Sequence, residues 1–252
     1  MFNFNFKKKK KTTRPNDQMV LVDSKNFRFV EAYKSLRTNI LFSLQHKEGC
    51  RKIMVTSSFQ GEGKSVISTN LAACFAQMGS SVLIVDCDLR RSRVHKYLNL
   101  KSNPGLANIL GGFIDVSTAI QKTSIANLFA LSGGVIPPNP SELIGSSRME
   151  MLVKELEKAF DYIIFDTPPV NVVSDALSLV NLVDGVVVIV SQNLSNSVAL
   201  TKCVQSLEFA NAKILGVVFN NVDKNTSGLD YKYGYHSKYY SKNYYYKKPY
   251  EN

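Results

Sequence analysis

A glycine-rich stretch between two patterned segments constrains the fold of this chain more than any other feature. SFQGEGKS, at 58–65, follows the apolar run 51–57 and opens the helical pattern 64–79. Glycines in such a loop let backbone N–H groups turn inward around phosphate oxygens, and the positive end of the following helix faces the same anion. The strand before it and the helix after it favour a phosphate-binding loop over a chance turn. The predicted nucleotide-binding residues are Ser58, which replaces the usual first glycine, with Phe59, Gln60, Gly61, Glu62, Gly63, Lys64, Ser65 and Val66.

The rest of the chain alternates short apolar runs with amphipathic patterns. Runs rich in Val and Ile predict strands, and apolar residues at helical spacing predict helices between them. Such alternation indicates an α/β fold: a doubly wound, mainly parallel sheet with helices on both faces. The predicted strands are 51–57, 81–86, 127–134, 161–166, 184–192 and 213–222, and the main predicted helices are 29–44, 64–79, 147–160, 175–183 and 195–210.

Aspartates stand at the ends of two of these strands. Asp86 and Asp88 close VLIVDCD, and Asp166 closes DYIIFD. In a doubly wound sheet, ligands lie beyond the carboxyl ends of the strands, so we expect all three carboxylates beside the phosphate loop. Phosphoryl transfer needs carboxylates to hold Mg²⁺ and to orient or deprotonate the attacking oxygen. Asn220 ends the last strand, where its amide could pair with a base edge or belong to an ordinary turn.

The net charge of +11 lies mostly near the two ends of the chain. Residues 1–20 carry a net charge of +5 and residues 225–252 a net charge of +3. This distribution favours basic tails over a folded groove-binding face, and no base-reading motif is present, so we expect no nucleic acid partner. We predict three parts: a basic flexible tail at 1–20, a folded domain at 21–224 and a flexible tail at 225–252.

The cysteines and the apolar runs bear on the compartment. Cys50, Cys74, Cys87 and Cys203 show no metal-ligand spacing, and reduced thiols indicate a cytosolic protein. No signal peptide is expected, because the charges of MFNFNFKKKKK follow a very short apolar patch. No apolar run approaches the roughly 20 residues of a membrane span. The N-terminal phenylalanines and lysines predict contact with anionic lipid, and a solvated tail is the alternative.

Nine of the twelve tyrosines lie in the last 22 residues, interleaved with lysines. This segment has no Val, Ile, Leu, Met or Phe, so it cannot offset the entropy of ordering its backbone, and we expect it to be disordered. Composition alone leaves two readings open: a low-complexity terminus or a substrate. The tyrosines concerned are Tyr231, Tyr233, Tyr235, Tyr239, Tyr240, Tyr244, Tyr245, Tyr246 and Tyr250.

Together, SFQGEGKS, VLIVDCDLRR, PPNPSELIGSSRM, YIIFDTPPV and the tyrosine cluster resemble the bacterial tyrosine kinases of capsule and exopolysaccharide operons. The resemblance runs from about Glu31 to the C-terminus and implies the P-loop NTPase fold, with partition and septum-placement ATPases as relatives. Those relatives carry an early lysine in the phosphate loop that this chain lacks, which favours the kinase over a non-kinase ATPase switch.

The resemblance implies an autokinase that uses ATP and Mg²⁺ to phosphorylate its tyrosine cluster in trans. Lys64 would bind the terminal phosphates and Asp86 would act on the acceptor phenol. Asp88 would support the metal through water, and Ser65, Asp86 and Asp166 would complete its coordination. A cognate protein-tyrosine phosphatase is implied as a partner, and the regulated process is polysaccharide polymerisation and export.

The resemblance also implies ring-shaped oligomers and a membrane partner. The ring contact of the family is a Glu-x-x-Arg-x-x-Arg motif, for which this chain has Glu31, Lys34 and Arg37. Lys34 keeps the charge but lacks the planar fork of arginine. The alternative for these residues is a solvated helix face with i,i+3 pairs. A chain without its own spanning helix is expected to be activated, at the inner face of the membrane, by the cytoplasmic tail of a separate membrane protein.

Overall fold

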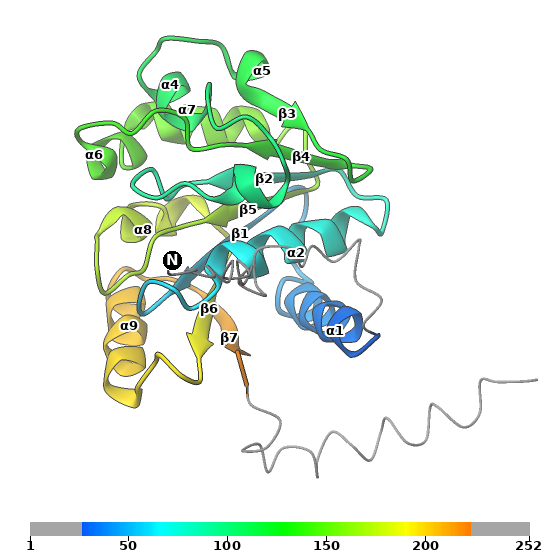
Figure 1. Cartoon of the computed structure of the whole chain (residues 1–252), viewed down its shortest axis with the longest axis vertical. Coiled ribbons are helices and arrows are strands. Elements are labelled where there is room, and N and C mark those ends of the chain that lie inside the picture. The colour runs from blue at the N-terminus through cyan, green and yellow to red at the C-terminus, as the bar shows by residue number, and fades with distance from the viewer. Residues whose placement is uncertain (1–26, 223–252) are drawn as a thin grey trace, which may run out of the picture.

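The computed structural model describes residues 27–222 of the chain (Figure 1). The predicted tails at 1–20 and 225–252, with the nine clustered tyrosines, lie outside the described residues. The four cysteines are all free and buried. None of the helices within 27–222 combines the length and the apolar character needed to cross a bilayer.

The core of the fold is a seven-stranded sheet with the order β3-β4-β2-β5-β1-β6-β7. All neighbouring strands pair in parallel except β3 and β4, so the predicted mainly parallel sheet is confirmed. The antiparallel edge strand β3 was not predicted, because three residues are too few to show a period. The strands are β1 (Arg51–Ser57), β2 (Val82–Asp86), β3 (Ile120–Lys122), β4 (Leu128–Leu131), β5 (Tyr162–Asp166), β6 (Gly185–Ser191) and β7 (Ile214–Asn220).

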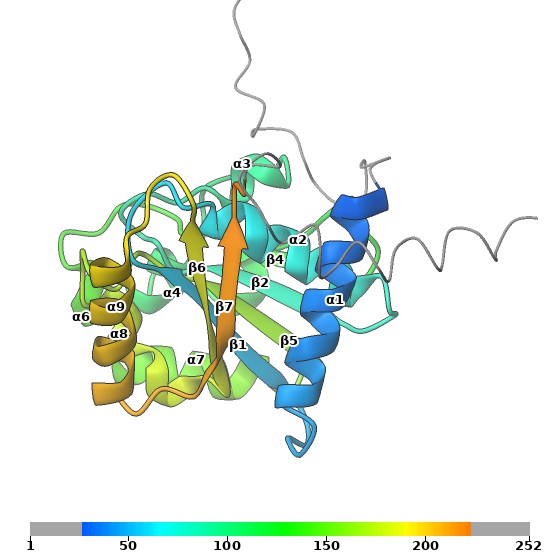
Figure 2. The same ribbon diagram turned by 90° about the horizontal axis from the view of Figure 1, so that it is seen from below.

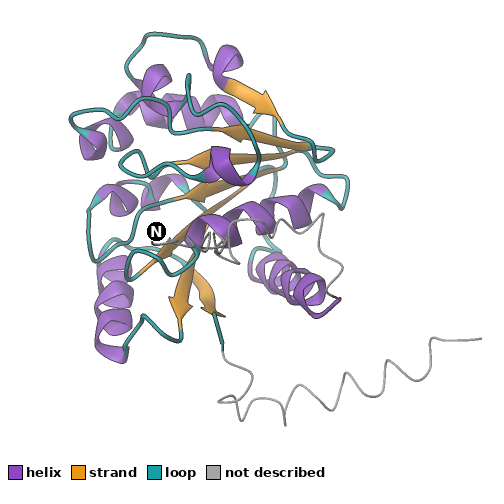
Figure 3. Cartoon of the chain, in the orientation of Figure 1, coloured by secondary structure: helices purple, strands orange, loops and turns teal. Residues whose placement is uncertain are grey.

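Helices cover both faces of the sheet, as Figures 1 and 3 show. One face carries α1 (Phe27–Ser43), α2 (Lys64–Ala76) and α3 (Val94–Tyr97). The opposite face carries α4 (Leu106–Leu110), α5 (Val116–Ala119), α6 (Pro140–Ile144), α7 (Ser147–Leu156), α8 (Asp175–Ser178), the 3-10 turn η2 (Val180–Leu182) and α9 (Ser197–Phe209). Figure 2 shows α1 and α9 flanking the β6–β7 end of the sheet from opposite sides. The single helix predicted at 175–183 is instead α8 followed by η2.

Alternation along the strands divides the apolar residues between two cores. In β2, Leu83 and Val85 belong to the core on the α7 side of the sheet, whereas Val82 and Ile84 belong to the core on the α2 side. Successive side chains of a strand point to opposite faces, so a strand covered on both faces must be apolar at nearly every position. This requirement explains why the strands appear in the sequence as continuous Val and Ile runs.

Phe75 of α2 anchors the helix that follows the phosphate loop. Its ring is completely buried and stacks on Tyr162 of β5, with 4.2 Å between the ring centroids. We expect Phe75→Ala to lower the free energy of unfolding by roughly 3–5 kcal/mol, because the lost contacts leave a cavity. Urea unfolding measures this change. Phe209→Ala is the control: that side chain is 92% exposed, and its loss should change stability by less than about 0.5 kcal/mol. Equal effects of the two substitutions would contradict this packing.

Candidate functional site

The phosphate loop lies between β1 and α2, as the sequence predicted. Gly61 and Gly63 have φ angles of +85° and +95°, which glycine adopts without strain, and α2 begins at Lys64. The N-terminus of this 13-residue helix therefore opens onto the loop, where it favours an anion. A pocket of about 380 Å³ lies at this point, lined by Gln60, Gly61, Gly63, Lys64, Ser65, Val66, Asp88, Arg91, Arg93 and Tyr97.

Side chains behind the loop hold its shape. The buried carboxylate of Glu62 accepts hydrogen bonds from the backbone N–H of Phe59, at 2.7 Å, and from the Ser195 hydroxyl. The Asn220 amide donates to the backbone carbonyl of Glu62 at 2.8 Å. A Cβ at Gly63 would lie 2.2 Å from Asn220 Nδ2, so a larger residue would displace that amide, and the φ of +95° itself favours glycine. Glu62 and Asn220 thus brace the loop from within, and contact of Asn220 with a base stays a prediction.

Two of the predicted aspartates lie side by side at the carboxyl edge of the sheet. Asp86 ends β2, Asp166 ends β5, and the parallel register pairs them directly. Both are buried. The Asp86 carboxylate accepts hydrogen bonds from the Ser92 hydroxyl at 2.7 Å and from the N–H groups of Arg93 and Val94 at 2.8 and 3.0 Å. Asp86 therefore ties the start of α3 to the sheet.

Asp166 has an oxygen available for a further partner. Its Oδ1 lies 3.0 Å from the Ser68 hydroxyl of α2, whereas its buried Oδ2 has no hydrogen-bond partner within residues 27–222. Buried polar atoms are usually satisfied, and a carboxylate oxygen near a phosphate loop suits Mg²⁺ directly or through water. The donor set therefore fits a magnesium nucleotide, with Ser65 and Asp166 as the residues that would hold the metal.

Burial raises the pKa of both carboxyl groups. Burial raises the pKa of Asp166 to about 7; repulsion from Asp86 adds to this effect, and Lys64 opposes it. Burial also raises the pKa of Asp86 to about 6, against the hydrogen bonds from Ser92, Val94 and Arg93. Two buried carboxylates in adjacent positions resist simultaneous ionisation, so this edge of the sheet favours a bound cation.

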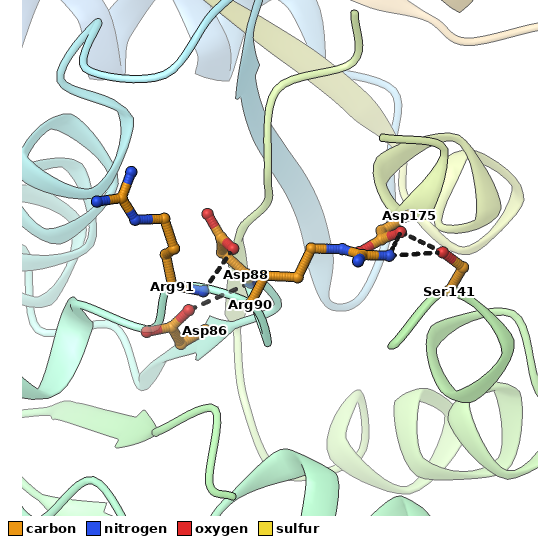
Figure 4. Close-up of polar contacts among 6 residues, drawn as sticks. All are labelled: Asp86, Asp88, Arg90, Arg91, Ser141 and Asp175. Carbon is orange, nitrogen blue, oxygen red and sulfur yellow. Dashed lines mark hydrogen bonds and ion pairs between the residues drawn. The ribbon is translucent and has the colours of Figure 1, made fainter. Parts of the chain in front are cut away.

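Asp88 lies beyond the end of β2, half-buried at the pocket wall. Its Oδ1 accepts a hydrogen bond from the backbone N–H of Arg91 at 3.0 Å, and the Arg91 guanidinium donates to Gln60 in the phosphate loop at 2.8 Å. Figure 4 shows Asp86, Asp88 and Arg91 together on this turn. Arg91, Arg93 and Tyr97 also line the pocket but were not predicted to belong to the site, although the basic segment after β2 was the available signal.

The described residues contain no group of three or more His, Cys, Asp or Glu side chains arranged to hold a metal. In nucleotide sites Mg²⁺ is bound by one or two carboxylates together with phosphates and water, so the protein need not supply a complete cage. The catalytic and metal-binding roles of Lys64, Ser65, Asp86, Asp88 and Asp166 remain predictions.

The three residues predicted for ring contact separate into two environments on α1. Lys34 Nζ pairs with Glu31 Oε1 at 2.8 Å on the helix surface, the i,i+3 pair that was the alternative interpretation. Arg37 instead turns inward and donates to the Cys74 carbonyl of α2 at 2.8 Å. Their part in an oligomer remains a prediction.

Comparisons with known proteins give the family. A family model described as ParA, NUBPL iron-transfer P-loop NTPase, matches residues 49–240. The putative tyrosine-protein kinase CapB of Staphylococcus aureus is 36% identical over 229 residues, which cover 90% of this chain and 98% of the relative. The tyrosine-protein kinase YwqD of Bacillus subtilis is 38% identical over 75% of this chain and 80% of its own length. This chain belongs to the bacterial tyrosine kinases.

Solved structures of bacterial tyrosine kinases agree with this assignment. The chimerical protein CapA2B2 is 37% identical, with a TM-score of 0.75 over 81% of this chain and 88% of that one. The kinase domain of Escherichia coli ETK is 33% identical, with a TM-score of 0.75 over 79% of this chain and 77% of that one. This bacterial tyrosine kinase therefore transfers phosphate to tyrosine, and its P-loop NTPase fold binds a nucleotide.

The raised pKa of Asp166 predicts a pH-dependent effect of Asp166→Asn on the nucleotide-free kinase. The folded protein holds a proton on Asp166 well above the ordinary value of 3.8, so ionisation destabilises the fold as the pH rises toward about 7. Asparagine cannot ionise. We expect the variant to be more stable than the wild type at pH 8 by on the order of 1–3 kcal/mol, with little gain at pH 4.

Urea unfolding at the two pH values measures this difference. Asp115→Asn is the matched control, because Asp115 is exposed in front of α5. A difference between Asp166→Asn and the wild type that is the same at both pH values would contradict a buried, raised-pKa carboxyl.

Proposed function

We propose that this kinase uses ATP and Mg²⁺ to phosphorylate the tyrosine cluster of a neighbouring copy. The supporting observation is the meeting, at one edge of the sheet, of the phosphate loop and the paired carboxylates of Asp86 and Asp166. Asn220 ends β7 against the phosphate loop, and the tyrosine-rich segment follows it in the sequence. The described residues therefore end close to the phosphate loop, and the acceptor tyrosines come next in the sequence.

Each site residue has a proposed task. Lys64 and the loop N–H groups bind the β and γ phosphates, and Ser65, Asp166 and, through water, Asp88 hold the metal. Bound Mg²⁺ supplies neutralisation of the charge that develops on the phosphates. The phenol oxygen forms a bond to the γ phosphorus as the bond to the β–γ bridging oxygen breaks, and ADP leaves with that electron pair.

Asp86 is the proposed acceptor of the phenol proton. A phenol with a pKa near 10 is a poor nucleophile at neutral pH, so a base must take its proton during transfer. A general base works best when its pKa lies near the working pH, and burial raises the pKa of Asp86 to about 6. In the structure Asp86 Oδ2 accepts the bonds from Ser92, Arg93 and Val94, whereas Oδ1 accepts the backbone N–H of Asp88 at 3.2 Å. Oδ1 is therefore the proposed proton acceptor, and the cap on Oδ2 can stay in place.

We further propose a role in capsular or exopolysaccharide polymerisation and export, on the strength of the family resemblance. The kinase would lie in the cytoplasm at the inner membrane face, held and activated by the cytoplasmic tail of a separate membrane protein. The relative CapA2B2 is described as a chimerical protein, which agrees with a kinase that works with a second polypeptide. A ring with contacts through Glu31, Lys34 and Arg37, a cognate tyrosine phosphatase and contact of the N-terminal lysines with anionic lipid complete the proposal.

Two complementary variants test phosphorylation in trans. Lys64→Ala carries intact tyrosines but lacks the phosphate-binding ammonium, and a second variant has all nine clustered tyrosines changed to Phe. Each alone should give no anti-phosphotyrosine signal on the cluster after incubation with Mg-ATP and the partner tail. Mixed, they should label the Lys64→Ala chain, which a size tag distinguishes. If the wild type were phosphorylated on the cluster but the mixture of the two variants were not, transfer would occur within one chain.

Phosphorylation should also loosen the ring. Each phosphate adds nearly two negative charges and reverses the mild positive charge of the tyrosine-rich segment. We expect the native mass to fall after Mg-ATP treatment of the wild type and to stay constant for the variant with Phe at all nine positions. An unchanged mass of fully phosphorylated wild type would contradict this role of the charge.

A further inference from the structure

Arg90 connects the turn after β2, which carries Asp86 and Asp88, to two helices on the face of the sheet that is covered by α4 to α9. Its Nε donates to Asp175 Oδ2 at 3.0 Å, and its Nη2 lies 3.3 Å from Asp175 Oδ1. Nη2 also lies 3.2 Å from the Ser141 hydroxyl, which itself donates to Asp175 Oδ1. Asp175 is the first residue of α8, and Ser141 belongs to α6. The positioning cluster consists of these three residues: Arg90, Asp175 and Ser141.

The two arginines of the turn extend in opposite directions. Figure 4 shows Arg90 reaching toward Asp175 and Ser141, whereas Arg91 points to the other side. Arg91 binds Gln60 of the phosphate loop, so the turn is fastened to the nucleotide side by one arginine and to α6 and α8 by the other. Both anchors begin within three residues of Asp88 in the sequence.

Because Asp175 is buried, its ion pair requires the guanidinium of arginine at position 90. The Asp175 side chain has no exposed surface, whereas 43% of the Arg90 side chain is exposed. A buried carboxylate needs a paired cation, and the planar guanidinium satisfies both of its oxygens in one orientation. Lysine would keep the charge but could not reproduce that two-point geometry.

We propose that Arg90 is a positioning residue for phosphoryl transfer, which acts through its ion pair with Asp175 and the Ser141 hydroxyl. The cluster fixes the turn that carries Asp86 and Asp88 relative to the bound phosphates. The inference rests on the proposed roles of these two aspartates. A carboxylate that must meet a transferring phosphoryl group tolerates little displacement, so an error of about 1 Å costs on the order of 100-fold in rate.

Two variants separate positioning from mere stability. Arg90→Lys keeps the charge and loses the fork. The double variant Arg90→Met with Asp175→Leu removes both charges at once, so no buried carboxylate is left unpaired. Phosphate transfer from Mg-ATP to tyrosine is measured on the full chain with the activating partner tail, together with the affinity for a fluorescent ADP analogue and the melting temperature.

We expect both variants to lose about 10- to 100-fold in kcat, with KM for ATP and affinity for the ADP analogue within about threefold of wild type. The double variant should melt within a few degrees of wild type.

The matched control is the ion pair between Lys52 and Glu157, at 2.6 Å, near the amino end of β1 and away from the pocket. Lys52→Met with Glu157→Leu should leave kcat unchanged. A double variant at 90 and 175 with wild-type kcat would overturn the proposal, and so would an equal loss of kcat in the control pair. Wild type and Asp86→Asn are measured in the same phosphate-transfer assay. An inactive wild type, or a fully active Asp86→Asn, would refute the proposed function and not the positioning role of Arg90.

Discussion

The parallel register of β2 and β5 is the constraint on which the site depends. It sets Asp86 directly beside Asp166, and β5 pairs in turn with β1, which leads into the phosphate loop. Burial removes the hydration of both carboxylates and raises their pKa values, and repulsion from Asp86 raises the pKa of Asp166 further. Lys64 is nearby, and Oδ2 of Asp166 has no hydrogen-bond partner within the described part of the chain, so the same edge suits an anionic nucleotide and its metal.

Polar side chains that are not among the residues lining the pocket hold its loops in place. Glu62 ties the phosphate loop to Ser195, and Asn220 ties it to the end of β7. Asp86 fastens the start of α3, and Arg90 fastens the acidic turn to α6 and α8. Catalytic loops positioned by a rigid sheet need such bonds, because an unpaired buried backbone or side-chain group would destabilise the fold. The site is therefore built from the whole carboxyl edge of the sheet.

Much of the site could be predicted because its residues follow the strands in a fixed order. The glycines, Lys64 and Ser65 appear between a strand and a helix, and the aspartates appear where apolar runs end. Three features could not be predicted: Arg37 turns inward, Asn220 braces the phosphate loop, and Arg90 and Arg91 bind partners in opposite directions. Each depends on a partner 31 to 158 residues away in the sequence, which no local pattern indicates.

The sequence by itself determined the fold class, the phosphate loop and the family, since apolar periodicity and contiguous motifs are local properties of the chain. It also placed the tyrosine cluster after the last strand. Only the tertiary structure decided which strands are neighbours, and with it which carboxylates lie side by side and which side chains brace the loops. Strand order and burial are set by packing across the sheet, and the electrostatic effects that tune the site arise from that proximity.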